Sequence, residues 1–408
     1  MYDFSKIAFM MDSICIYRNI LKDPVMKKLH KLINLSSKIN NLSYKHKIIS
    51  LYCEICNILF NSESEGNLTT YISNLIKYDD NKFSRACAKD LKIDENILTI
   101  SNTDIKNLLT ISNLDSHTIK NILSKKMFKE DKNILNYLPN YVITNKSSLD
   151  IDYVKFYKNQ GVGIFAKYNG FLFDGKIKPI KNLDKILISD LKQYKSQQDK
   201  VINNTVSFLS SKPANNVLLY GDRGTGKSST IKAILNEYSH KGLRMIEIKK
   251  QSLLNLDKLM FMLQEIPLKF IVFIDDLSFN ENDDRFCVLK ALLEGSLASK
   301  PKNVLIYATS NRRHLVKENF SSREGNEVHI ADTIDENLSL YDRFGLTVTF
   351  IKPNKDDFLE IVRLIAIDKG LDVKNEKLFS EAEKFALSKG VRSPRIARQF
   401  INYICSTN

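Results

Sequence analysis

The sequence predicts an α/β core in which a five-stranded parallel sheet lies between helices, with a mostly α-helical N-terminal domain and a helical C-terminal lid. Two observations support this fold class. Apolar runs typical of buried strands alternate with helical segments between residues 187 and 353, a pattern that favours a parallel sheet covered on both faces. Residues 1–149 and 354–408 instead have the apolar spacing expected of helices.

Residues 1–149 are expected to form a helical domain. The segments VMKKLHKLINLSSKI and DIKNLLTISNLDSHTIKNILSKK have amphipathic spacing, and glycine is almost absent from this part. No residue pattern in it suggests a chemical reaction. We therefore expect an interaction domain that binds a protein partner whose identity the sequence does not give.

Residues 150–186 are expected to form a small β element that joins this domain to the core. The run GVGIFAKYNGFLFDGKI alternates in the manner of strands, and Asn169-Gly170 is a dipeptide typical of two-residue hairpin turns. A helix and a connector are expected to follow, up to the first strand of the core.

Residues 187–353 are expected to form the core, and the lid is expected at 354–408. The predicted strands are 217–220, 244–249, 270–274, 304–309 and 346–351, and the predicted helices between them are 227–238, 256–265 and 284–298. The lid is predicted to contain three helices, at 356–369, 376–388 and 394–404.

The turn after the first core strand has the GxxxxGK[ST] pattern of a phosphate-binding loop. Its glycines permit the left-handed backbone that lets successive N–H groups point into one concavity, and the following helix offers the positive end of its dipole. The lysine is expected to contact β- and γ-phosphates, and the first serine to ligate Mg²⁺. The alternative is a glycine-rich turn that binds nothing. The candidate nucleotide-binding residues are Gly221, Asp222, Arg223, Gly224, Thr225, Gly226, Lys227, Ser228 and Ser229.

The third strand ends in two carboxylates, Asp275 and Asp276. Ligands of open α/β sheets gather at the carboxyl ends of strands, and Mg²⁺ takes few carboxylates while retaining water. We therefore expect Asp275 to hold the metal, together with Ser228, and Asp276 to activate the attacking water. The alternative is a pair of solvated loop acids.

The fourth strand is followed by Asn311, a candidate catalytic residue. An uncharged amide at this place can hold the attacking water or contact the γ-phosphate without adding charge. Ser310 is the second choice for this role, and a turn-forming asparagine is the alternative.

Three groups of arginines are candidates for the cation that phosphoryl transfer requires. Arg312 and Arg313 follow the fourth strand, Arg343 precedes the fifth, and Arg395, with Arg392 nearby, begins the last helix. We select Arg343 as a finger acting on a neighbouring subunit and Arg395 as a sensor on the lid. Surface salt bridges are the competing explanation for each.

Composition adds little about partners. The net charge of +14 is compatible with nucleic-acid binding, but the lysines are scattered, and abundant Lys, Asn and Ile are also typical of proteins from AT-rich genomes. Of six cysteines only Cys53 and Cys56 form a CxxC, in an apolar segment with helical spacing, where packing in the core is expected instead of metal or redox chemistry.

A cytoplasmic location without membrane contact is expected. No stretch approaches 18 uninterrupted apolar residues, and the first residues, which include Asp3 and Asp12, do not have the pattern of a signal peptide.

Over roughly residues 187–408 the sequence resembles the AAA+ ATPases. The resemblance depends on five ordered motifs: GDRGTGKS, FIVFIDD, ATSN, DRFG and SPRIA. Within that superfamily it is similar to a family of uncharacterised bacterial P-loop ATP-binding proteins, with matching runs such as ANNVLLYGDRGTGKSS, LKALLEG, VLIYATSNRRHL and ARQF.

The resemblance implies ATP as the nucleotide, bound by residues 221–229, and Mg²⁺ as its metal. It also implies that Asp275 and Asp276 form Walker B, Asn311 is sensor 1, Arg343 is an arginine finger and Arg395 is sensor 2. One residue departs from the superfamily pattern, because Asp276 stands where glutamate is usual. The shorter side chain implies slow turnover, as in the initiators and loaders that act as ATP-controlled switches.

The function expected is therefore a slow, oligomeric, Mg²⁺-dependent ATPase that remodels or loads a partner. Two alternatives stay open: an ATP-dependent switch or scaffold with little or no hydrolysis, and a DNA-associated loader. Protein threading is not expected, because Met260, Phe261 and Met262 have the spacing of core residues in a helix.

Overall fold

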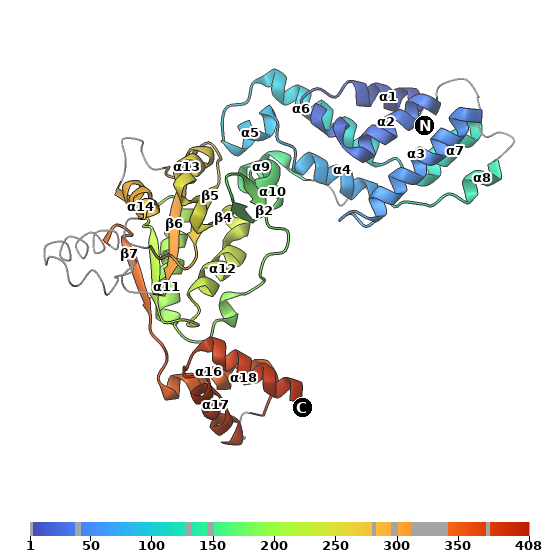
Figure 1. The fold of residues 1–408 in the computed structure, drawn as a ribbon. Helices are drawn as coiled ribbons and strands as arrows, with labels where there is room; N and C mark the ends of the chain where they lie inside the picture. The colour runs from blue at the N-terminus through green and yellow to red at the C-terminus, as the bar shows by residue number, and fades with distance from the viewer. Residues whose placement is uncertain are drawn as a thin grey trace. The chain divides into compact units, whose positions relative to one another are not determined.

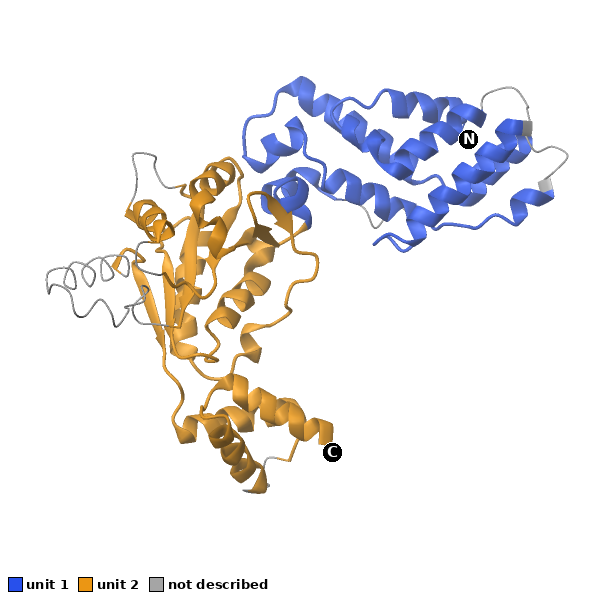
Figure 2. Ribbon diagram, viewed as in Figure 1, with its two compact units in different colours: residues 1–167 blue, residues 168–408 orange. Residues whose placement is uncertain are grey.

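The computed structural model describes residues 3–36, 42–126, 132–144, 151–279, 283–294, 301–311, 342–372 and 376–407. The chain divides into two compact units, residues 1–167 and 168–408 (Figure 2). Each unit has its own hydrophobic core and is described separately.

The first unit is helical throughout its described residues, apart from one isolated β-bridge between Asn67 and Val142 (Figure 1). Apolar residues at helical spacing give each long helix one buried face, and these faces meet in a single core. The elements are α1 (Phe4–Asp12), η1 (Arg18–Lys22), α2 (Pro24–Ser36), α3 (Leu42–Phe60), α4 (Leu68–Lys77), α5 (Lys82–Ala88), α6 (Glu95–Ser112), α7 (Ser116–Lys126), α8 (Lys132–Asn136), α9 (Tyr153–Gln160) and α10 (Gly163–Lys167).

A buried carboxylate fixes the turn between α1 and η1. Asp104 of α6 accepts hydrogen bonds from the backbone N–H groups of Cys15, Ile16 and Tyr17 at 3.0, 2.7 and 3.1 Å. Buried carboxylates need such donors, and these three satisfy this one. The Tyr17 hydroxyl also lies 3.0 Å from that of Tyr157, so α9 packs as part of this helical unit.

The second unit is built on a seven-stranded sheet with the order β2-β1-β4-β5-β6-β3-β7. Every neighbouring pair is parallel except β1 and β2. The strands are β1 (Gly170–Phe173), β2 (Ile177–Pro179), β3 (Val217–Gly221), β4 (Leu243–Ile248), β5 (Lys269–Ile274), β6 (Val304–Ser310) and β7 (Leu346–Phe350).

The prediction of a five-stranded sheet was wrong, because β1 and β2 extend it. β1 runs parallel to β4, and the Asn169 carbonyl accepts the Met245 N–H at 3.0 Å. Asn169-Gly170 therefore starts a strand and is not a hairpin turn. The chain reverses around Gly175, whose φ of +69° suits a turn. Residues 153–167, assigned to the same β element, form α9 and α10.

Helices cover both faces of the sheet. On one face, α11 (Lys195–Leu209) and α12 (Lys227–Tyr238) pack against alternate strand residues, including Leu219, Ile271 and Phe273. On the other lie α13 (Leu256–Gln264) and α14 (Asp284–Glu294) (Figure 1). Short 3-10 turns fall between these elements, at Ile188–Asp190, Ser239–Lys241 and Lys250–Asn255.

Three C-terminal helices form a small core of their own. They are α16 (Lys355–Asp368), α17 (Glu376–Ser388) and α18 (Pro394–Thr407). Their apolar faces meet around residues such as Phe358, Ala382 and Phe400, which are buried. α16 begins where the Asn354 side chain accepts the Asp357 N–H at 2.8 Å, a typical N-cap.

Phe171→Ala is expected to destabilise the second unit by about 3–5 kcal/mol, because the buried ring of β1 fills the sheet core. Lys178→Ala on exposed β2 is the matched control and should change stability by less than about 0.5 kcal/mol. Urea denaturation of both variants measures the difference. Equal stability of the two would mean that β1 does not belong to the folded sheet.

Candidate nucleotide-binding site

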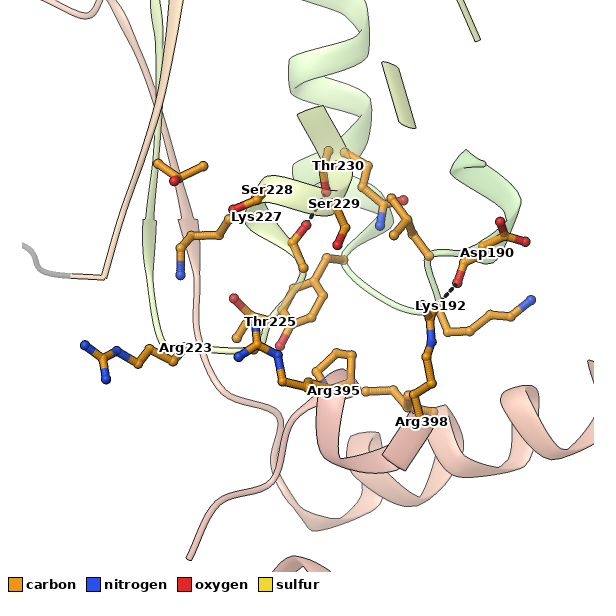
Figure 3. A pocket seen from close by; sticks show the side chains of 18 of the residues that line it. Asp190, Lys192, Arg223, Thr225, Lys227, Ser228, Ser229, Thr230, Arg395 and Arg398 are labelled. Atoms are coloured by element: carbon orange, nitrogen blue, oxygen red, sulfur yellow. Dashed lines mark hydrogen bonds between the residues drawn. The ribbon is translucent and has the colours of Figure 1, made fainter. Parts of the chain in front are cut away.

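A cavity of about 540 Å³ opens at the carboxyl ends of the central strands (Figure 3). It is bounded by the loop between β3 and α12, the ends of β5 and β6, the connector before α11, and α18. Its lining includes Asp190, Lys192, Tyr194, Gln198, residues 223–230, Asp275, Asp276, Thr309, Asn311, Arg395, Arg398 and Asn402. Most of the residues predicted from the sequence thus meet in one place.

The loop over residues 221–228, named here the phosphate loop, needs its glycines. Gly221, Gly224 and Gly226 have φ of +131°, +76° and +98°. A Cβ on Gly221 would lie 2.0 Å from the Phe350 carbonyl oxygen, so no other residue fits there. Gly226 is the N-cap of α12, so the loop leads directly to the positive end of a helix dipole.

Lys227 is the buried cation of the site, with a relative exposure of 5%. Its Nζ donates to the carbonyl oxygens of Gly221 and Asp222 at 2.8 and 2.7 Å, and to Asn311 Oδ1 at 3.0 Å. Burial lowers the pKa of Lys227 to about 8, against the opposing effect of nearby aspartates. The ammonium is held by neutral oxygens, so a polyanion in the cavity would be a stronger partner for it.

Three oxygen-bearing side chains converge at the end of β5. Ser228 Oγ and Thr309 Oγ1 each donate to Asp275 Oδ1 at 2.6 Å. A serine hydroxyl beside a carboxylate is a hard oxygen donor set of the kind that Mg²⁺ prefers. Ser228 and Asp275 were predicted as a pair, and the fold brings them together.

Asp276 adopts a left-handed backbone, with φ of +52°. Its N–H donates to Thr309 Oγ1 at 2.9 Å, and its Oδ1 accepts from Asn311 Nδ2 at 2.7 Å. Asn311 thereby bridges Asp276 and Lys227. Hydrogen bonds thus connect Lys227, Asn311 and Asp276, and all three residues line the cavity.

The two arginines near the start of α18 differ in their surroundings. Arg395 lines the cavity, and its backbone N–H donates to the Gly224 carbonyl oxygen at 3.3 Å. Arg392 is instead bonded to Glu383 of α17, so it serves the packing of the C-terminal helices. Figure 3 shows Arg395 and Arg398 extending from α18 into the lining.

Arg343 lies outside this cavity. It precedes β7 at the amino end of that strand, while the phosphate loop follows the carboxyl end of the parallel strand β3. Its guanidinium lies 3.4 Å from Glu294 of α14, and both side chains are substantially exposed. Arg312 and Arg313 lie outside the described residues.

Asp222 was predicted to bind nucleotide, but its side chain turns away from the cavity. Its Oδ2 accepts the Lys352 N–H at 2.7 Å, and its own N–H donates to the Phe350 carbonyl at 2.9 Å. Asp222 therefore ties the phosphate loop to the connector between β7 and α16. Its carbonyl oxygen contacts the site, because it accepts a hydrogen bond from Lys227.

Several lining residues were missed by the sequence analysis. Arg398 follows Arg395 by three positions, so helical periodicity could have identified it, and its guanidinium donates to the Asp190 carbonyl at 3.3 Å. Thr309 was treated only as part of a strand. Tyr194 and Lys192 lie in a connector whose pattern gave no signal.

Two further sequence predictions concern residues outside the site. Cys56 is buried in α3 and Cys53 is half-buried, and among the described residues no three or more His, Cys, Asp or Glu side chains are grouped as metal ligands. Phe261 is 69% exposed and Met262 is 38% exposed, so the prediction that they pack in the core was wrong, whereas Met260 is buried. None of the described helices has the length and hydropathy needed to span a bilayer.

Comparison with known proteins gives the family of the chain. The family described as "Protein of unknown function (DUF815)" matches residues 165–408, more than half of the sequence. The chain belongs to this family. The resemblance to an uncharacterised P-loop family is therefore confirmed, and the match includes the whole of the cavity described above.

Two other comparisons add less. No curated protein matches the chain. A solved structure of C. elegans PCH-2 is similar, with 17% identity and a TM-score of 0.38, and the alignment covers 54% of this chain and 64% of that one. The matched region is thus less than two thirds of that protein.

The residues present fit a nucleotide with its divalent cation. The glycines of the phosphate loop and the start of α12 provide backbone N–H groups, Lys227 provides a buried charge, and Ser228 with Asp275 provides metal ligands. Asn311 lies between the Lys227 ammonium and the Asp276 carboxylate and bonds both, so each charged group can still meet a charged ligand.

Affinity for a fluorescent ATP analogue is expected to change little between about pH 7 and the Lys227 pKa of about 8, and to fall as the pH rises further. Lys227 loses its charge in that range, and phosphates attract only the charged form; the loss is at most about tenfold per pH unit. Lys227→Met should bind weakly with a flat profile between pH 7 and 9.5. A wild-type affinity that did not change over this range would contradict the role of the ammonium.

Proposed function

We propose that this DUF815 protein is a slow, Mg²⁺-dependent ATPase that works as a homo-oligomer and couples its nucleotide state to a partner. The observation that carries the proposal is the convergence of Lys227, Ser228, Asp275, Asp276 and Asn311 on one cavity. These residues follow three separate strands of the sheet, and together they provide the functions that phosphoryl transfer requires.

The proposed roles follow from the contacts. Backbone N–H groups of the phosphate loop and the Lys227 ammonium would bind the phosphates, and Ser228 with Asp275 would hold Mg²⁺. The metal ion, when bound, neutralises charge that develops on the phosphate oxygens. Asp276 would accept the proton of the attacking water, and Asn311 would orient that water.

Cations around the γ-phosphate would come from two sources. Arg395 lines the cavity of its own chain and is proposed as the sensor on the helical lid. Arg343 lies at the opposite end of the strands, beside Glu294, so it is proposed to act on a neighbouring copy. This division requires an oligomer for full activity.

The second candidate function is an ATP-controlled switch with negligible turnover. The contact that favours it is the 2.7 Å hydrogen bond from Asn311 to Asp276, which occupies an oxygen of the proposed base. Aspartate is also one methylene shorter than glutamate, so it approaches a water less closely. In this alternative the helical N-terminal unit would bind a protein in one nucleotide state only.

Asp276→Asn is expected to lower phosphate release by about a hundredfold or more, since the amide cannot accept a proton, while ATP binding is retained. Lys227→Ala should weaken binding itself by about tenfold to a hundredfold, because it removes a charged donor to phosphate. Phosphate release and equilibrium binding are measured on each variant. Unchanged hydrolysis in either one would refute the assignment, and tight ATP binding by the wild type without turnover would favour the switch.

Mixtures of two inactive variants test the position of the arginine. Arg343→Ala alone and Lys227→Ala alone should each hydrolyse little ATP, but mixed subunits should regain activity, because an intact loop then faces an intact Arg343. Arg363→Ala, which loses an exposed ion pair with Glu360, is the control and should hydrolyse ATP normally. Mixtures no more active than the separate variants would mean that Arg343 does not act between copies.

A further inference from the structure

Thr309 is a buried polar residue near the carboxyl end of β6, and the roles proposed above do not include it. We propose that Thr309 is a positioning residue, whose single hydroxyl sets both aspartates of the metal and water sites. The inference rests on the proposed function, because it assigns how Asp275 and Asp276 are held for that chemistry.

The hydroxyl makes one contact with each aspartate. Thr309 Oγ1 donates its proton to Asp275 Oδ1 at 2.6 Å, and it accepts the Asp276 N–H at 2.9 Å. Thr309 is 2% exposed, so little water competes for these bonds. The donated hydrogen bond orients the Asp275 carboxylate, and the accepted hydrogen bond holds the Asp276 backbone. The two contacts therefore act on different parts of the site.

The position of Thr309 follows from the end of the β-ladder. The last register pair between strands β5 and β6 is Ile274 with Ala308, after which the regular strand pairing ends. The Thr309 carbonyl then accepts the Leu277 N–H at 2.7 Å, so the same residue pins three consecutive positions after β5. Thr309 thus continues the contacts between β6 and the chain after β5 beyond their last register pair.

The order matters because Asp276 has a backbone that side-chain-bearing residues rarely adopt. Its φ of +52° is left-handed, a conformation that persists only where surrounding contacts hold it. The N–H bond to Thr309 is one such contact, and the side-chain bond to Asn311 is another. Without the Thr309 hydroxyl, the backbone N–H of Asp276 would lose this hydrogen bond, and the position of its carboxylate would depend on Asn311.

The chemistry required at position 309 is narrow. The group must donate one hydrogen bond and accept another from the same atom, inside the sheet. Serine keeps this ability, while valine has nearly the same shape and neither function. Thr309→Val and Thr309→Ser therefore separate the hydroxyl from the volume of the side chain.

Thr205 provides the matched control. Its hydroxyl is also buried in this unit, bonded to the Val201 carbonyl at 2.8 Å and lying 2.8 Å from the Tyr307 hydroxyl. Tyr307 is on β6, two positions before Thr309, but Thr205 has no hydrogen bond to either aspartate. Thr205→Val thus loses a buried hydroxyl against the same strand without changing the site.

The experiment measures, for the full chain, the affinity for Mn²⁺ at saturating ATP by electron paramagnetic resonance, together with phosphate release and thermal unfolding. Thr309→Val is expected to weaken Mn²⁺ binding about tenfold, the effect of removing a hydrogen bond to a charged group. It is also expected to slow phosphate release relative to the wild type. ATP affinity without metal should stay unchanged. Thr309→Ser should restore the metal affinity, and Thr205→Val should match the wild type in it despite a lower melting temperature.

Equal Mn²⁺ affinity in Thr309→Val and Thr205→Val, with ATP binding intact in both, would overturn the role of Thr309 and leave the proposed function standing. Failure of Thr309→Ser to restore the affinity would overturn it as well, because packing and not the hydroxyl would then matter. A wild-type chain that binds no ATP would overturn the proposed function first and this inference with it.

Discussion

The site depends on one topological constraint, the position of β6 between β3 and β5 in a parallel sheet. Parallel strands end at the same edge, so the residues that follow these three strands must share a small space. Lys227 after β3, Asp276 after β5 and Asn311 after β6 are joined in one chain of hydrogen bonds for this reason. Helices pack on both faces of the sheet behind that edge.

The polar groups at this edge satisfy one another's hydrogen bonds: Lys227 and Thr309 are buried, while Asp275 and Asp276 are exposed. A buried ammonium such as Lys227 is costly unless oxygens surround it, and two of the three it uses are carbonyls of its own loop. The hydroxyls of Ser228 and Thr309 both donate to one oxygen of the exposed Asp275 carboxylate. The arrangement keeps opposite charges apart and bridged by neutral groups, so each remains able to meet a charged ligand.

The sequence was sufficient for features that depend on local pattern. The phosphate loop, the five strands β3 to β7 and the Ser228–Asp275 pair follow from glycine spacing and apolar runs, and the fold contains them. A β element was predicted in this region, but its place in the core sheet was missed because the pairing of β1 with β4 joins residues far apart along the chain. Thr309 and the outward turn of Asp222 were missed for the same reason, since their partners come from other strands and connectors. Phe261 was misassigned because periodicity gives a helix its faces but does not say which one is covered.

The bond between Asp222 and Lys352 has a mechanical consequence. The phosphate loop begins at Gly221, which touches the Phe350 carbonyl so closely that no Cβ fits, and only four residues separate Phe350 from α16. A displacement of the loop must carry the connector with it or break the hydrogen bonds that Asp222 makes to Phe350 and Lys352. The start of the phosphate loop and the start of α16 are thus tied together by these hydrogen bonds. A movement of either one is transmitted to the other through the few residues of the connector.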